Sequence, residues 1–249
     1  MSLNRSDAGK LCITLDMDWA RDEVAGPVAE MMRRRGVKAT FFATNHSRLL
    51  SGLDGEQFEV GLHPNFNNCA GDFRAPLEGL KRLYPRARGA RSHSLFVSSH
   101  ILQLYVEHGL NYESNIFLFE HEGLRPVLRF EGFVSIPFCW SDDKHISLQR
   151  PFTLDALGLE TPGLKVLNFH PMHVFMNTSS DAHYESYKRH YQEPDRLAEF
   201  VNRRSPGVGT LFGALLEHLE ETGRRTYTMG EVCDEFLAAG REKAPASAS

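Results

Sequence analysis

The stretch LCITLDMDWA, residues 11–20, decides the fold class. Its first five residues form an apolar run with the length and composition of a buried β-strand. Residues 23–35 then carry apolar side chains at helical spacing and end before Gly36, a residue that favours the end of a helix. A strand followed directly by an amphipathic helix is the first half of a βαβ unit, so the pattern predicts an α/β protein.

The same alternation continues along the chain and favours a closed or nearly closed barrel, because seven or so strands fit poorly into an open sheet of this size. Further strands are predicted at residues 38–43, 58–62, 111–114, 127–130, 133–138 and 165–169, and further helices at residues 76–83, 98–108, 210–222 and 229–239. Residues 177–209 are polar and loop-rich, with two short helices, and are interpreted as an insertion or lid. We expect a single domain over residues 1–241 and a disordered tail at residues 242–249.

Composition excludes several classes of protein. The chain has 249 residues, 41% hydrophobic and 24% charged, which is typical of a globular domain, and its net charge of −4 argues against a nucleic-acid-binding protein. No apolar run approaches the ~20 residues of a membrane span, and residues 1–19 show no secretory signal. Four cysteines without C-x-x-C spacing suggest reduced thiols. These observations together predict a cytoplasmic protein.

Two aspartates, Asp16 and Asp18, close the first predicted strand. Residues two apart in a strand point to the same face, and parallel α/β proteins place their sites at the carboxyl ends of their strands. Two crowded carboxylates repel unless a cation or a shared proton relieves them. The pair is therefore a candidate site, with helix capping or a solvated loop as the alternative.

Histidines end two other predicted strands, each in a His-Pro step. His63 follows the strand at residues 58–62 and His170 follows the strand at residues 165–169, so the two imidazoles are expected to meet at the barrel mouth. A hydrogen-bonded structural histidine is the alternative for each. His173 is a nearby candidate whose role stays open between substrate contact, support and packing.

Three further charged residues stand at strand ends. Arg91 lies in GARSHSL, and Asp142 and Asp143 lie in PFCWSDD. Taken singly, a surface cation is the alternative for the arginine and a helix N-cap for the aspartates.

In their order along the chain, these residues resemble the NodB-homology polysaccharide deacetylases, carbohydrate esterase family four, and in particular deacetylase-like proteins attributed to bacterial O-antigen biosynthesis. That family carries T-F-D-D-G, H-S/T-x-x-H, R-x-P-x-G, an Asp/Trp motif and Leu-x-x-His. The matching segments are TLDMD at 14–18, KATFF at 38–42, EVGLHPNFN at 59–67, RSHSL at 91–95, GLNYESN at 109–115, CWSDD at 139–143 and LNFHP at 167–171. The resemblance covers about residues 11–175 and implies a distorted (β/α) barrel with about seven parallel strands.

The resemblance also implies a role for each candidate residue. Asp16 would be the general base, His170 the general acid, and Arg91 would orient the base through an acid near Trp140, either Asp142 or Asp143. A divalent metal ion, with zinc expected, would be held by Asp18, His63 and Asn67. Apart from the resemblance, we expect substrate contacts at Trp19, Trp140, Asp142, Asp143 and His173, with packing under the next helix as the alternative for Trp19.

Two departures from the family pattern affect these expectations. Asn67 stands where the second motif ends in histidine, and an amide oxygen is a weaker donor for zinc. Either Asn67 ligates and the metal preference shifts, or His93 or His173 replaces it, or the metal is absent. The third motif, RSHSL, lacks the proline and glycine of the family, so the substrate groove is expected to differ from that of polymer-acting relatives.

The first hypothesis is a metal-dependent hydrolase that removes an N-acyl group, with acetyl expected, from an amino sugar in O-antigen biosynthesis. Its partner would be an amino-sugar or sugar-linked small molecule. Two alternatives remain: a carbohydrate-binding barrel without catalytic activity, suggested by Asn67 and the altered third motif, and an amide hydrolase acting on a small non-sugar substrate.

Overall fold

The structure is a computed structural model that describes residues 9–130 and 132–241, so the tail predicted at residues 242–249 lies outside the described part. The strands are β1 (Leu11–Asp16), β2 (Ala39–Ala43), β3 (Phe58–Leu62), β4 (Gly89–Ala90), β5 (Tyr112–Glu113), β6 (Val127–Leu128), β7 (Val134–Ser135), β8 (Trp140–Ser141) and β9 (Lys165–Phe169). The α-helices are α1 (Asp22–Arg33), α2 (Arg48–Ser51), α3 (Arg74–Leu83), α4 (Ser99–Glu107), α5 (Asp142–Ser147), α6 (Pro171–Met176), α7 (Asp181–Tyr187), α8 (Pro194–Leu197), α9 (Val208–Thr222) and α10 (Met229–Arg241). Three short 3-10 helices are η1 (His93–Leu95), η2 (Leu154–Leu157) and η3 (Lys188–His190).

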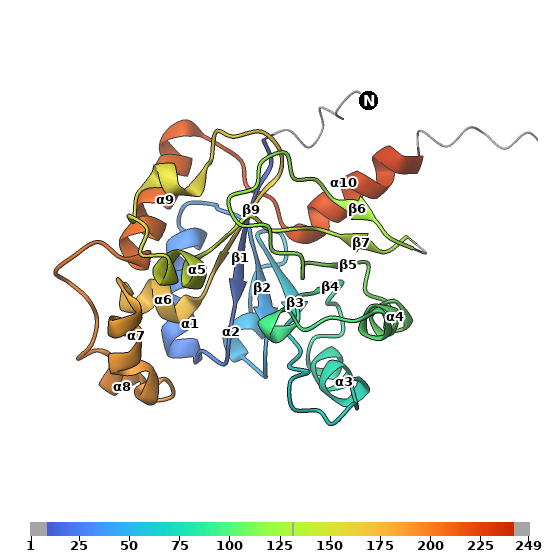
Figure 1. The fold of residues 1–249 in the computed structure, drawn as a ribbon, viewed down its shortest axis with the longest axis horizontal. Helices are drawn as coiled ribbons and strands as arrows, with labels where there is room; N and C mark the ends of the chain where they lie inside the picture. Colours follow the sequence, from blue (N-terminus) through green and yellow to red (C-terminus); the bar gives the residue numbers. More distant parts are fainter. Residues whose placement is uncertain (1–8, 131, 242–249) are drawn as a thin grey trace, which may run out of the picture.

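The described residues form one nine-stranded sheet in the order β6-β7-β5-β4-β3-β2-β1-β9-β8 (Figure 1). Neighbouring strands are parallel except for the antiparallel pair β6 and β7. The two end strands of this order, β6 and β8, share no ladder within the described residues, so the sheet is an incompletely closed barrel. The predicted fold class, a distorted (β/α) barrel, is confirmed.

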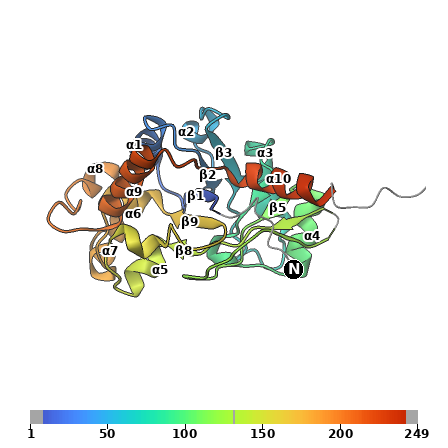
Figure 2. The same cartoon turned by 90° about the horizontal axis from the view of Figure 1, so that it is seen from above.

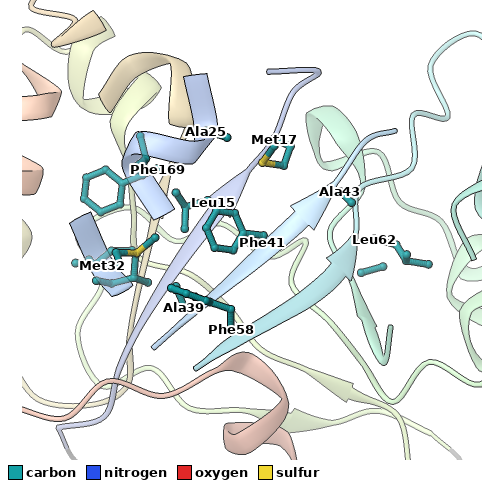
Figure 3. Close-up of a cluster of buried hydrophobic side chains, with 14 of the residues drawn as sticks. Leu15, Met17, Ala25, Met32, Ala39, Phe41, Ala43, Phe58, Leu62 and Phe169 are labelled. Atoms are coloured by element: carbon teal, nitrogen blue, oxygen red, sulfur yellow. The ribbon is translucent and has the colours of Figure 1, made fainter. Parts of the chain in front are cut away.

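The long central strands are buried on both faces, which explains their nearly continuous apolar sequences. All six residues of β1 and all five of β2 and β9 are buried. On one face, Leu15 and Phe41 pack toward Met32 of α1, beside Phe169 (Figure 3). Burial of this layer supplies most of the driving force that fixes the register of the central strands.

The amino-terminal ends of the central strands are closed by α10 (Figures 1 and 2). The amide of Met229 donates to Thr40 Oγ1 at 2.9 Å, and the amide of Gly230 donates to Glu59 Oε2 at 2.7 Å. These side chains satisfy amide groups at the start of α10 that have no partner inside the helix. The carboxyl ends of the same strands are therefore the end of the barrel available for a functional site.

The polar segment at residues 177–209 contains α7 and α8, the two short helices predicted there, together with η3. Both views place α7 and α8 at one end of the molecule, beside α6 (Figures 1 and 2). Across residues 9–130 and 132–241, the helices lack the combined length and apolar content of a membrane-spanning segment.

Candidate active site

Residues far apart in the sequence meet at the carboxyl ends of the parallel strands. Asp16 is the last residue of β1, His63 follows β3, Arg91 follows β4, Asp142 follows β8 and His170 follows β9. Asp18 lies in the turn beyond β1, so a turn rather than strand alternation brings it beside Asp16. The position matches the general rule for open α/β sheets, whose sites lie beyond the carboxyl ends of the strands.

Asp16 is held by a hydrogen bond on each carboxylate oxygen. Arg91 donates from a terminal guanidinium nitrogen to Oδ1 at 3.0 Å, and Asn168 Nδ2 donates to Oδ2 at 2.9 Å. Arg91 is completely buried, and its guanidinium lies 4.7 Å and 4.3 Å from the ring centroids of Phe42 and Phe138. A buried arginine in a fixed geometry forms a strong charge-assisted hydrogen bond to a carboxylate.

The acid beside Trp140 has a different partner from the one predicted. Asp142 accepts a hydrogen bond from His170 Nδ1 at 2.6 Å and from the His170 amide at 2.7 Å. Arg91 reaches Asp16 directly, without an intervening acid. The predicted route from Arg91 to the base through Asp142 or Asp143 is therefore corrected: Arg91 binds the base itself, and Asp142 orients the histidine. Because Asp142 is fully buried and both its oxygens face His170, it is not placed to contact a substrate.

The contact with Asp142 favours the protonated form of the His170 imidazole. Burial alone would lower the pKa of His170, but the charge and hydrogen bond of Asp142, with the charges of Asp18 and Asp143, raise it well above its usual value. Because an ionised carboxylate only accepts hydrogen bonds, Nδ1 carries a proton. Nε2 is then directed toward the site, 3.6 Å from Asp18 Oδ2.

Asp18, His63 and His93 form a group of potential metal ligands. Asp18 Oδ1 lies 3.1 Å from His63 Nε2 and 3.1 Å from His93 Nδ1, and one ligand atom from each residue lies within 4.8 Å of the others. Ligand atoms at ~2.0–2.2 Å from a tetrahedral zinc ion are about 3.3–3.5 Å apart, so the spacing fits. Two imidazoles and one carboxylate, with a fourth position left for water, form a donor set used by catalytic zinc sites.

The two histidines of this group also affect the ionisation of Asp18. Burial alone would raise the pKa of Asp18, but hydrogen bonds to His63 and His93 and the nearby His170 lower it well below its usual value. The carboxylate is therefore ionised, as a metal ligand must be. The hydrogen bond to Asp18 in turn raises the pKa of His93.

Asn67, the third predicted ligand, lies elsewhere. It is exposed, its amide nitrogen donates to Ser94 Oγ at 3.3 Å, and its backbone amide donates to Asn65 Oδ1. Within the described residues, His93 occupies the third position around Asp18 and His63. Of the three sequence alternatives, the geometry favours replacement of Asn67 by His93.

The predicted substrate-contacting residues divide between the site and the core. Asp143 lines the site pocket, whereas Trp140 is only 2% exposed and packs against His145 and Phe169. His173 is also buried and packs beneath His170, with its Nδ1 3.1 Å from Thr178 Oγ1. Trp19 is half-buried beside His93, at a ring-centroid distance of 4.9 Å.

The residues at the carboxyl ends of the strands line a pocket of about 160 Å³. Its polar lining includes Asp16, Asp18, His63, His93, Ser141, Asp143, Asn168 and His170, and its apolar lining includes Leu95, Phe117 and Phe138. A small pocket in which acids and imidazoles converge beside apolar side chains has the properties of a candidate active site.

Asn168 was not singled out in the sequence, although it bridges three site residues. Its Oδ1 accepts from Arg91 at 2.5 Å and from Thr14 Oγ1 at 2.9 Å, which leaves its Nδ2 to donate to Asp16. The available signal was a polar residue inside the apolar strand KVLNF, two positions before His170.

Comparison with known proteins gives a match to a family model over most of the chain. Residues 13–188 match the family model described as WbmS-like polysaccharide deacetylase. A crystal structure from Bordetella bronchiseptica, described as a polysaccharide deacetylase involved in O-antigen biosynthesis, is 32% identical, covers 86% of this chain and 92% of its own, and superposes with a TM-score of 0.80. No curated protein matches.

More distant structures share the fold. A polysaccharide deacetylase from Mycobacterium smegmatis is 14% identical, over 98% of this chain and 95% of its own, with a TM-score of 0.59. A pseudoenzyme of the CE4 family from Bacillus anthracis is 15% identical, over 93% of this chain and 67% of its own, with a TM-score of 0.51. At these identities the likeness concerns the fold alone.

Proposed function

Because this chain belongs to the WbmS-like polysaccharide deacetylase family, we propose that it is a metal-dependent hydrolase that removes an N-acetyl group from an amino sugar in bacterial O-antigen biosynthesis. The observation that carries this proposal is the convergence of Asp18, His63 and His93 beside Asp16 and His170 in one pocket. The four cysteines are free thiols, which supports a reducing, cytoplasmic setting. The proposed substrate is an amino sugar or another sugar-linked small molecule.

The metal would be held by Asp18, His63 and His93, and zinc suits this donor set. A divalent ion bound there supplies Lewis acidity, which polarises the acyl carbonyl and lowers the pKa of a bound water. The ionised Asp18 would supply one negative charge to such an ion, and the imidazoles of His63 and His93 would bind it through their ring nitrogens.

Asp16 is the proposed general base. Its carboxylate is held by Arg91 and Asn168 on opposite oxygens, so its direction is fixed before a substrate enters. From that position it accepts the proton of the attacking water. The guanidinium of Arg91 is buried against two aromatic rings, which hold it in one position. This rigidity keeps the carboxylate of Asp16 aligned.

His170 is the proposed general acid. Asp142 keeps the imidazole protonated and directs Nε2 into the pocket, where it donates a proton to the departing amine of the sugar. The apolar side chains of Leu95, Phe117 and Phe138 suit the acyl methyl group, and Asp143 is placed to accept a hydrogen bond from a sugar hydroxyl.

The proposed function is tested by measuring acetate release from a panel of N-acetylated amino sugars, their nucleotide derivatives and lipid-linked forms. Purified protein supplied with zinc, cobalt or manganese is expected to release acetate from at least one of them, and metal-free protein is not. Metal bound without acetate release from any substrate would favour the carbohydrate-binding alternative. Release from small non-sugar amides alone would favour the third hypothesis.

Replacing His93 and Asn67 one at a time shows which of these two candidates is the third metal ligand. His93→Ala is expected to weaken zinc binding by at least about 10-fold, because a lost ligand should cost no less than the lost outer contacts that typically cost 10–100-fold. Asn67→Ala, a change of a residue on the surface, is expected to leave zinc affinity within about 2-fold of wild type. Competition with a chromogenic chelator measures both affinities, and a reversed order would return Asn67 to the ligand set.

A further inference from the structure

The turn that carries Asp18 has an unusual backbone. Asp18 has φ of 40° and Trp19 has φ of 59°, so two consecutive residues with side chains adopt the left-handed region. That region favours glycine, because a Cβ atom there approaches the following carbonyl oxygen. A bulky tryptophan in this conformation costs free energy, and such strain persists only where the surrounding structure enforces it.

Two hydrogen bonds from distant segments hold the strained peptide groups. The amide of Trp19 donates to Thr44 Oγ1, one residue beyond β2, at 2.9 Å. The carbonyl of Trp19 accepts a hydrogen bond at 2.9 Å from Nε2 of Gln192, which lies between η3 and α8 in the polar segment at residues 177–209. Both polar groups of the strained residue are therefore tied to other parts of the fold.

The side chain of Trp19 contacts a proposed metal ligand. Its ring meets the ring of His93 edge to face, with the centroids 4.9 Å apart and the planes at 71°. His93 begins the short helix η1, in which Ser94 and Leu95 also have positive φ. A short helix with such a backbone constrains its own first side chain weakly, so the imidazole is held by its contacts: the hydrogen bond to Asp18, the ring of His63 at 5.5 Å and the nearer ring of Trp19.

We propose that Trp19 is a positioning residue for the metal site, whose ring fixes the imidazole of His93 and whose strained backbone is the cost of placing that ring directly after Asp18. This inference rests on the proposed metal site at Asp18, His63 and His93. Gln192 and Thr44 support it by holding the peptide groups of Trp19. The polar segment at residues 177–209 therefore stabilises, through Gln192, the turn that carries one ligand and supports another.

Three variants test this inference without any substrate. Trp19→Gly removes the ring and relieves the backbone, so the metal-free variant should melt no lower than wild type while its zinc affinity falls by about 10-fold, as for other outer contacts of metal ligands. Trp19→Phe keeps an aromatic edge and should restore affinity to within about 3-fold. Gln192→Ala leaves the ring in place but releases the carbonyl, and should weaken zinc binding in the same direction.

Zinc affinity is measured by chelator competition, and the melting temperature of each metal-free protein by thermal unfolding. Wild-type affinity in Trp19→Gly would overturn the inference, and so would a Trp19→Phe variant as weak as Trp19→Gly. If Trp19→Gly fails to fold, Gln192→Ala decides, because unchanged affinity in that variant contradicts the inference. Failure of the wild-type protein to bind zinc would refute the metal site of the proposed function itself, which is a distinguishable result.

Discussion

Asp16→Asn is expected to lower kcat for deacetylation by about 10²–10⁴-fold, the usual contribution of a general base. The amide is nearly isosteric with the carboxylate but does not accept a proton from water. The ligand group Asp18, His63 and His93 is untouched, so zinc binding should persist. Acetate release and zinc content measured on the same preparation check both parts of the expectation.

The substitution also has a cost in stability that must be separated from catalysis. Arg91 and Asn168 both donate to Asp16, so the new amide group directs an NH₂ toward one of these donors. A buried unmatched donor costs about 1–3 kcal/mol, measurable as a reduced free energy of unfolding in urea. Asp143→Asn is the matched control, because it makes the same chemical change in the same pocket and should raise KM while kcat stays within a few-fold. Full activity in Asp16→Asn would remove Asp16 from the role of base.

The central part of the fold could be predicted from the sequence because its strands are long and buried. The apolar runs at 11–15, 58–62 and 165–169 correspond to β1, β3 and β9 within one residue at each end. Strands β4 and β8 contain two residues each, too few for any periodicity to be recognised. Of the strand predicted at 133–138, only the two residues of β7 form a strand. The other apolar residues of this run are buried by side-chain packing without belonging to the strand, so their hydrophobicity did not indicate strand length.

The site could be predicted where chemistry coincides with a strand end. Asp16, His63 and His170 each stand at such a position, so the topology rule alone brings them together. His93 follows a two-residue strand and enters the site through a short 3-10 helix, so no periodic pattern indicated which way it points. The departure from the family pattern at Asn67 left His93 and His173 as alternatives, and the structure brings His93 rather than Asn67 beside Asp18 and His63.

The direct pairing of Arg91 with Asp16 could not be predicted from the sequence either. In the sequence, Asp142 and Asp143 are equivalent acids at the end of one strand, and either is a plausible partner for a buried cation. The structure separates them by burial: Asp142 is fully buried against His170, whereas Asp143 faces the pocket. Two adjacent carboxylates thus acquire different roles from environment alone, a distinction that residue identity does not encode.

Asp142→Asn is expected to lower kcat by on the order of 10²–10⁴-fold at pH above neutrality, with a smaller loss at acidic pH. The general acid acts while His170 is protonated, and that form disappears as the pH rises through the pKa of His170. Asp142 holds this pKa well above its usual value, against the opposing effect of burial. Replacing its charge by a neutral amide lowers the pKa of His170, so the alkaline limb of the pH–kcat profile should move to lower pH.

A second variant shows whether this shift operates through His170. His170→Ala should lose activity at every pH, and adding Asp142→Asn to it should cause little further loss, because residues that act as a unit are strongly non-additive. Asp142→Asn also weakens the two hydrogen bonds that Asp142 accepts from the Nδ1 and the backbone amide of His170. The free energy of unfolding of Asp142→Asn is therefore measured as the control for a structural effect. An alkaline limb that stays in place in Asp142→Asn, or a double variant whose losses simply multiply, would contradict the assignment of His170 as an acid tuned by Asp142. The expected result is an alkaline limb that moves to lower pH in Asp142→Asn and a double variant no less active than His170→Ala. That result would establish that the negative charge of Asp142 keeps the His170 imidazole protonated when the sugar amine departs.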